Sequence, residues 1–272
     1  MPRFQRTLEN KLVAMAIADV YTGRDRIIHN PYQSQPTADD GVVTGPNYTV
    51  ADFQLTDDTL SVNRRAHKAE HIDKIEMLQA RYDLAMSRAD RHAYAVKNKI
   101  DAFVFETAVT VAGATVAGAE LVGGAANAAI TLSDANIDNL LNGVRETLLT
   151  NNAEVDRGLF VAMSPKNFTS LSEYLQTNGF AVSDDTIRNG FQTHALGFDI
   201  YVTNNLYNDG TDDYIVAGVK GSIQLALPRD GGEFEKKSVS GKFGKEVVTS
   251  QVYNATIWEN CKPEVLAIKV AS

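Results

Sequence analysis

The chain has 272 residues, of which 44% are hydrophobic and 22% charged, a globular composition that argues against wholesale disorder. A formal net charge of −8 disfavours a protein that binds nucleic acid by neutralising phosphates, although it is compatible with enclosing DNA without binding it. The single cysteine, Cys261, excludes an intrachain disulfide and a CxxC zinc site and fits a reducing compartment.

The N-terminus carries Arg3, Arg6 and Glu9 without an apolar stretch, so no secretory signal is predicted. Apolar residues then recur at helical spacing and predict a short amphipathic helix. They are Leu8, Leu12, Val13, Ala16, Ile17 and Val20. This helix has no obvious local partner, and we therefore expect it to bury its apolar face on another subunit.

A projecting β-hairpin is predicted over residues 22–71. One strand begins at Arg26, Pro and Gly residues mark the tip, and the return strand runs through Phe53, Leu55, Leu60 and Val62. An isolated two-stranded hairpin is marginally stable in water, so this one should need a neighbour to lie on.

A long helix is predicted over residues 73–109, in one piece or in two collinear pieces, because apolar residues recur there at steps of three and four. They include Ile75, Ala93, Val96, Ile100, Phe103 and Thr107, while Asp101 falls on the opposite, polar side. Asp73 and Glu76 resemble a capping box at the start. The nearly uncharged stretch 111–130 contains Glu120 and four glycines, which predicts a small-residue loop rather than a membrane span.

A second unit follows, with a helix over 134–150 capped by Ser133 and a buried strand over 159–163. Ser164 and Pro165 begin another helix. Strands are predicted over 198–202, 214–219 and 223–227. This mixture indicates a compact α+β domain. The strand-rich tail is expected to return to the long helix, because a helix with one apolar stripe needs a covering layer.

The order of these elements resembles the major capsid proteins of tailed bacteriophages, which have the Hong Kong 97-type fold. The most specific pieces are residues 187–191 (IRNGF) and 196–206 (LGFDIYVTNNL). Residues 161–165 (VAMSP) and 262–265 (KPEV) also resemble family segments, and together the similarity covers almost the whole chain. Asn254 departs from the glycine that many relatives have after this tyrosine, which concerns a local turn.

The resemblance implies an N-terminal arm, an extended loop, a peripheral domain with a spine helix, an axial domain, and return strands of the peripheral domain. The corresponding boundaries are 1–21, 22–71, 72–131, 132–228 and 229–272. It further implies a non-enzymatic subunit that forms pentamers and hexamers of an icosahedral shell around double-stranded DNA, without cofactor, membrane contact or sequence-specific DNA binding. The expected location is the virion, assembled in the host cytoplasm. Because the chain starts directly with the arm, we expect a separate scaffolding protein, besides a portal.

Two alternatives remain. One is a cargo compartment of the same fold, an encapsulin-like shell, which the sequence does not separate from a DNA-filled head. The other is a zinc-dependent hydrolase, because residues 67–71 (HKAEH) match the H-x-x-E-H pattern of zinc peptidases. Such a site needs both histidines on one helical face and a third ligand, for which no later helix offers a clear candidate.

Other chemistry-bearing residues have simpler explanations. Ser164 lacks the G-x-S-x-G context of a nucleophile. Four pairs of aspartates fall in predicted turns without a calcium-loop pattern: Asp39-Asp40, Asp57-Asp58, Asp184-Asp185 and Asp212-Asp213. The residues expected to mediate assembly, by charge pairing and apolar docking onto adjacent subunits, are Arg26, Ile27, His29, Phe53, Arg64, Arg65 and Glu70.

Overall fold

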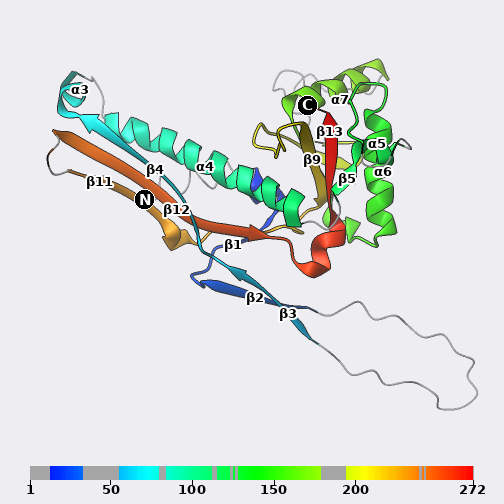
Figure 1. The fold of residues 1–272 in the computed structure, drawn as a ribbon, viewed down its shortest axis with the longest axis horizontal. Helices are drawn as coiled ribbons and strands as arrows, with labels where there is room; N and C mark the ends of the chain where they lie inside the picture. Colours follow the sequence, from blue (N-terminus) through cyan, green and yellow to red (C-terminus); the bar gives the residue numbers. More distant parts are fainter. Residues whose placement is uncertain are drawn as a thin grey trace, which may run out of the picture.

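The fold consists of two β-sheets linked by one long helix, together with a two-stranded ribbon (Figure 1). The computed structural model describes residues 13–32, 55–79, 84–111, 115–122, 125, 128–178, 194–238, 241 and 243–271. The mixture of helices and sheets within these ranges confirms the predicted α+β class.

Six strands form one sheet, in the spatial order β5-β13-β9-β6-β8-β7. Their bounds are β5 Thr115–Ala117, β6 Leu159–Met163, β7 His194–Ala195, β8 Phe198–Val202, β9 Asp212–Val219 and β13 Val265–Ala271. All five residues of β6 are buried. The sheet is therefore covered on both faces, which explains why its central strands are continuous apolar runs.

Three helices cover one face of this sheet (Figure 1): α5 Gly118–Leu121, α6 Ile137–Thr150 and α7 Pro165–Thr177. The apolar side of α6 is buried as predicted, with Leu140, Val144 and Leu148 in the core. Ser164 caps α7, its hydroxyl oxygen accepting a hydrogen bond from the backbone N–H of Asn167 at 3.4 Å. The helix start predicted from Ser and Pro is thus confirmed.

The predicted start of α6 was wrong. The helix begins at Ile137, and Asn136, not Ser133, holds the N-cap position. The Asn136 side-chain oxygen accepts a hydrogen bond from the Ser133 N–H at 2.9 Å, which closes a turn before the helix. Asn is common in such turns because its short side-chain amide hydrogen-bonds nearby backbone groups.

The second sheet is built around β12 Gly244–Thr256, which pairs with β4 along one side and with β10 and β11 along the other. The other bounds are β1 Asp19–Tyr21, β4 Arg64–Asp73, β10 Gln224–Ala226 and β11 Gly232–Lys237. The long helix α4 Leu84–Val111 runs along β12 and β4, as Figure 1 shows.

The buried side of α4 is the one that the spacing predicts, with Ala93, Val96, Ile100 and Phe103 in the core. Two details differ. A separate helix, α3 Lys74–Gln79, precedes α4, and its Ile75 is 64% exposed. Asp101, predicted on the polar side, is completely buried. The helical pattern alone does not reveal that another segment packs over this position.

That segment is the arm. Its described part forms α2 Ala14–Ile17, and Ala14 and Ile17 are fully buried against their own chain. The backbone N–H of Ala14 donates a hydrogen bond to the Asp101 carboxylate at 3.2 Å. This end of the arm therefore has a partner within the subunit, contrary to the expectation, whereas Leu8 and Leu12 lie outside the described residues.

The predicted hairpin forms at its base. β2 Ile27–Tyr32 and β3 Thr56–Ser61 pair antiparallel, and Phe53 lies outside the described residues. The base packs on the rest of the chain, since Leu60 and Val62 form a buried cluster with Trp258.

The H-x-x-E-H motif lies on strand β4 and not on a helix. Side chains of a strand alternate between its faces, so His67 and His71 lie on one face and Glu70 on the other. The helical zinc site that the motif needs is thus not formed, and the described residues contain no group of three or more side chains placed to hold a metal ion.

The closing strands divide between the two sheets. β12 returns to the long helix as expected and β11 pairs with β12, whereas β13 pairs with β9 in the six-stranded sheet. β10, expected in the unit over 132–228, lies beside β12 instead. The buried, apolar β13 suits a sheet covered on both faces.

Three short 3-10 helices complete the described elements: η1 Val155–Arg157, η2 Arg229–Gly231 and η3 Glu259–Glu264. No helix in the described ranges is both long enough and apolar enough to cross a bilayer.

Candidate assembly surface

An open cleft of about 430 Å³ lies where the hairpin base meets the second sheet. Six charged residues line it: Arg24, Asp25, Arg26, Arg64, Arg65 and Asp230. We call it the arginine cleft. The lining also includes apolar residues, namely Val62, Pro228 and Val252. Four arginines and two aspartates thus contribute to a partly apolar lining, in a chain of net charge −8.

Backbone hydrogen bonds bring these distant segments together. The N–H of Val62 donates to the Arg26 carbonyl at 2.8 Å, which joins the two ends of the hairpin. The N–H of Leu227 donates to the Tyr21 carbonyl at 2.8 Å, which ties the start of the hairpin to β10. Antiparallel pairing thus places residues near 25 beside residues near 63.

Two of the four arginines interact within the chain. Arg24 forms an ion pair with Asp230 across the cleft. The guanidinium of Arg64 lies 4.0 Å from the centre of the Phe103 ring, a cation–π contact between β4 and α4. Asp25 is also engaged, because its carboxylate accepts a hydrogen bond from the Tyr21 hydroxyl. That hydrogen bond raises the pKa of Tyr21.

Arg26 and Arg65 differ from the other two. Both are exposed, and neither forms an ion pair or side-chain hydrogen bond with the described part of the chain. Arg65 lies on the solvent face of β4, since Arg64 before it packs on α4. The cleft therefore presents two cations without an acidic partner among the residues that the structure describes.

The other predicted assembly residues that the structure describes do not line this cleft. Ile27 is 52% exposed on β2. His29 Nδ1 lies 2.8 Å from an oxygen of Asp57, across the hairpin. Phe53 lies outside the described residues. The structure thus groups Arg26, Arg64 and Arg65 in the lining of one cleft, which does not include Ile27, His29 or Glu70.

Glu70 takes part in a cluster inside the subunit. Its carboxylate lies 3.1 Å from His92 Nε2, 3.5 Å from Arg88 Nε and 3.6 Å from Lys68 Nζ. The contact with His92 lowers the pKa of Glu70, and the charges of Arg88 and Lys68 act in the same direction. His92 is buried between α4 and β12, so the cluster holds β4 on the long helix.

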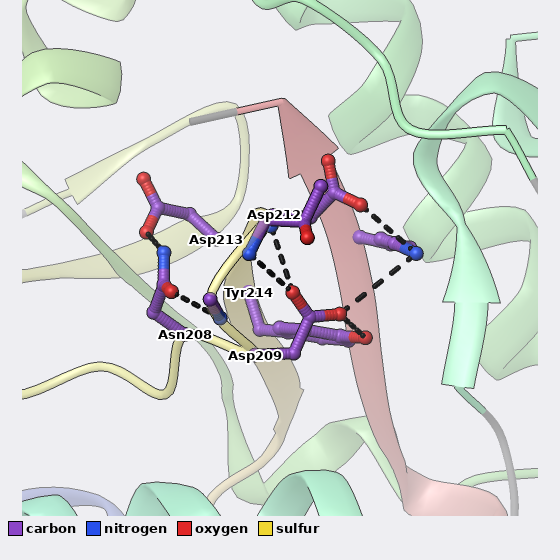
Figure 2. Close-up of polar contacts among 8 residues, drawn as sticks. Asn208, Asp209, Asp212, Asp213 and Tyr214 are labelled. Carbon is purple, nitrogen blue, oxygen red and sulfur yellow. Dashed lines mark hydrogen bonds and ion pairs between the residues drawn. The ribbon is translucent and has the colours of Figure 1, made fainter.

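The six-stranded sheet carries an acidic turn in which Asp209 is the central acceptor (Figure 2). One Asp209 oxygen accepts hydrogen bonds from the backbone N–H of Asp212 at 2.8 Å and of Thr211 at 2.9 Å. These bonds lower the pKa of Asp209. The Tyr214 hydroxyl donates to its other oxygen at 3.1 Å.

The neighbouring acids of this turn also have partners. Lys269 Nζ lies 2.9 Å from Asp212, and the Asn208 side chain donates to Asp213 at 2.7 Å. Figure 2 shows the Asn208 side chain directed toward Asp213. The acids accordingly stabilise the turn before β9 and leave little capacity for a ligand.

Cys261 is half-buried, and burial raises the pKa of its thiol to about 11. The nucleophilic thiolate is then scarce at neutral pH. Cys261 instead packs against two apolar clusters of the subunit.

Sequence reasoning missed Arg24 and Asp230 as members of the cleft. A signal existed for Arg24, because arginines occur near both ends of the predicted hairpin, and antiparallel pairing brings such ends together. No comparable signal existed for Asp230, which reaches the cleft through the second sheet.

No protein-family model and no curated protein sequence matches the chain. Solved structures do. The capsid of cyanophage P-SCSP1u matches with a TM-score of 0.68 and 12% identity, covering 94% of this chain and 86% of that one. The capsid of a native GTA particle matches with a TM-score of 0.67 and 16% identity, covering 98% and 91%. A virus-like particle from Pyrococcus furiosus matches with a TM-score of 0.61 and 12% identity, covering 98% and 96%. At these identities the likeness establishes a shared fold.

Proposed function

From the Hong Kong 97-type fold, which this chain shares with the phage capsid structures, we propose that it is the major capsid protein of a tailed bacteriophage. The main support for this proposal is that the structural similarity spans 94–98% of this chain and 86–91% of the two capsid chains. The match thus concerns a whole shell subunit and not one shared domain. The role that follows is structural, and self-association is its physical basis.

The finer arrangement is also part of the proposal. The subunit forms pentamers and hexamers, which close an icosahedral head around double-stranded DNA. The net charge of −8 suits a shell that encloses DNA without adhering to it. A scaffolding protein and a portal are the other proposed partners, and the head assembles in the host cytoplasm.

A cargo compartment of the same fold is the second candidate, because a virus-like particle from Pyrococcus furiosus, 96% of whose chain is covered, shares this fold, and the fold alone does not specify what a shell contains. The two candidates differ in what the shell contains. A nuclease-protected DNA genome in purified particles would support the capsid, and an enclosed protein without DNA would support the compartment.

Negative-stain microscopy of the expressed protein tests the shell directly. We expect closed particles or capsomer rings, alone or with a co-expressed scaffolding protein. A compact, protease-resistant monomer at high concentration, with or without that helper, would contradict the proposal.

We also propose Arg26, Ile27, Arg64 and Arg65 as contact residues between subunits. What supports this is the exposure of Ile27 and the position of the three arginines around one cleft. His29 and Glu70, first expected in the same role, have ionic partners inside the subunit. Exchanging both Arg64 and Arg65 for glutamate should reduce particle yield while the monomer stays folded; normal particle yield would contradict the assignment.

A further inference from the structure

The four arginines that line the arginine cleft differ in whether they have a partner within the chain. Arg24 is paired with Asp230, and Arg64 is held over Phe103. Arg26 and Arg65 line the same cleft without an acidic partner in the described chain. Like charges in one cleft repel each other, and the repulsion is relieved when an anion enters.

The chemistry of the cleft favours a carboxylate. A guanidinium offers a planar fork of N–H donors that matches the two oxygens of a carboxylate. Val62, Pro228 and Val252 line the cleft beside the arginines, and less water at the contact strengthens such a pair. The volume of about 430 Å³ admits one or two side chains, not a folded element.

The charges also disfavour nucleic acid as the occupant. Asp25 and Asp230 lie in the cleft lining, where they would repel a phosphate backbone. A single carboxylate side chain can approach Arg26 and Arg65 and still leave both aspartates on their present partners, Tyr21 and Arg24.

A second copy of this chain supplies suitable carboxylates. The chain carries 34 Asp and Glu residues against 26 Lys and Arg. Exposed acids without an ion pair in the described ranges include Glu76, Glu173 and Glu233. We infer that Arg26 and Arg65 bind a carboxylate of a second copy of this chain, and that the arginine cleft is a socket between subunits. This inference rests on the proposed function, because a shell brings many identical copies into contact.

Zero-length cross-linking can identify the occupant. Arg26→Lys and Arg65→Lys place a primary amine in the cleft, and a carbodiimide couples such an amine only to a carboxylate in direct contact. Particles assembled from equal amounts of light and ¹⁵N-labelled subunits are treated and digested, and cross-linked peptides are identified by mass spectrometry. We expect peptides that join position 26 or 65 of one copy to an Asp or Glu of the other, with mixed isotopic composition.

Arg24→Lys is the matched control, because Arg24 already has Asp230 as a partner within the chain. It should give a cross-link to Asp230 of the same isotopic composition, which shows that the reagent reaches the cleft. If that control reacts while positions 26 and 65 give only intrachain links or none, the inference is overturned. Links from these positions to another protein, or their protection by bound DNA, would overturn it as well.

A kinetic measurement gives an independent readout. Arg65→Glu should slow particle formation roughly tenfold, because charges at the edge of an interface act mainly on association. Arg91→Glu makes the same charge change at an exposed position of α4 outside the cleft and should leave the rate within about twofold. Equal rates for the two variants would contradict the inference. If the unaltered chain forms particles but the two lysine variants give no cross-link to a second copy, the socket alone is refuted, whereas absence of any particle would refute the proposed function.

Discussion

The six-stranded sheet and the hairpin base handle their charges in opposite ways. In the sheet region Asp199 is paired with Lys220 and His194, and Asp209 accepts hydrogen bonds from its own turn. At the hairpin base Arg26 and Arg65 line a cleft without an acidic partner in the described chain. The comparison teaches that one region satisfies these charges within its own elements, while the other leaves two arginines without an acidic partner among the described residues.

Disrupting the core of the six-stranded sheet should have the largest effect on the stability of the isolated subunit. Phe198 on β8 is 1% exposed and packs among the residues under α6 and α7. Phe198→Ala leaves a cavity, and we expect a loss of about 3–5 kcal/mol in the free energy of unfolding, measured by urea denaturation. Ile27→Ala, at an exposed position of β2, is the control and should change it by less than about 0.5 kcal/mol. Similar losses for both variants would remove the contrast.

The second largest loss of stability is expected from removing a buried charge next to the same sheet. Glu264 is 7% exposed, pairs with Arg157 and accepts a hydrogen bond from the Ser222 hydroxyl at 2.6 Å. Glu264→Gln removes the buried carboxylate that Arg157 and Ser222 share and leaves Arg157 only the exposed Glu154, 3.3 Å away, as counter-ion; a loss of about 2–3 kcal/mol is expected in urea denaturation.

Glu259→Gln is the matched control, since the Glu259–Lys262 pair is on the surface. It should change the free energy of unfolding by less than about 1 kcal/mol. If both substitutions had equally small effects, the claim that Glu264 is a structural charge would be wrong.

Asp101 lies where the arm meets the long helix, and one of its carboxylate oxygens has no hydrogen-bond partner among the described residues. Burial raises its pKa to about 6. Because the folded-state pKa lies above the unfolded value, the charged form destabilises the fold above pH 6, and the penalty disappears as the pH falls toward 4.

We therefore expect Asp101→Asn to stabilise the subunit by about 2 kcal/mol at pH 8 and by almost nothing at pH 4. The amide oxygen that this substitution introduces can still accept the hydrogen bond from the Ala14 N–H. Thermal unfolding at the two pH values measures the difference. A variant that is less stable than the parent at pH 8 would show that the carboxylate charge itself holds the arm.

The smallest effect on folding is expected in the arginine cleft. Arg65→Glu changes an exposed side chain without an ionic partner in the described chain, so the free energy of unfolding should change by less than about 0.5 kcal/mol. The same variant should lose particle yield, measured by sedimentation. A large loss of stability in the free subunit would mean that Arg65 serves the fold rather than assembly.

Local chemistry was predictable where the deciding partners are near in sequence. Ser164 and Pro165 predict the start of α7 because a cap needs only residues within one turn. The buried side of α4 follows from its spacing for the same reason. The start of α6 was missed because Ser133 and Asn136, three residues apart, are both residue types that are common at the N-cap of a helix.

The candidate site was predicted in part. Arg26, Arg64 and Arg65 were named from their place beside a hairpin, and they line one cleft. Glu70 was named from the same reasoning, yet it faces His92 on the long helix. Arg64 and Glu70 share the face of β4 that packs on the long helix, and their different positions along the strand give them different neighbours. The sequence does not show that residues 64–73 form a strand that pairs with β12.

By itself the amino-acid sequence determined the α+β class, the apolar side of the long helix, the hairpin and the order of elements, because each depends on periodicity or on short-range turn chemistry. Only the tertiary structure decided that β13 leaves β12 for the other sheet, that Asp101 is buried under the arm, and that two of the four cleft arginines have no acidic partner in the described ranges. These outcomes depend on contacts between residues far apart in the chain, where a local pattern is compatible with several partners and packing selects one.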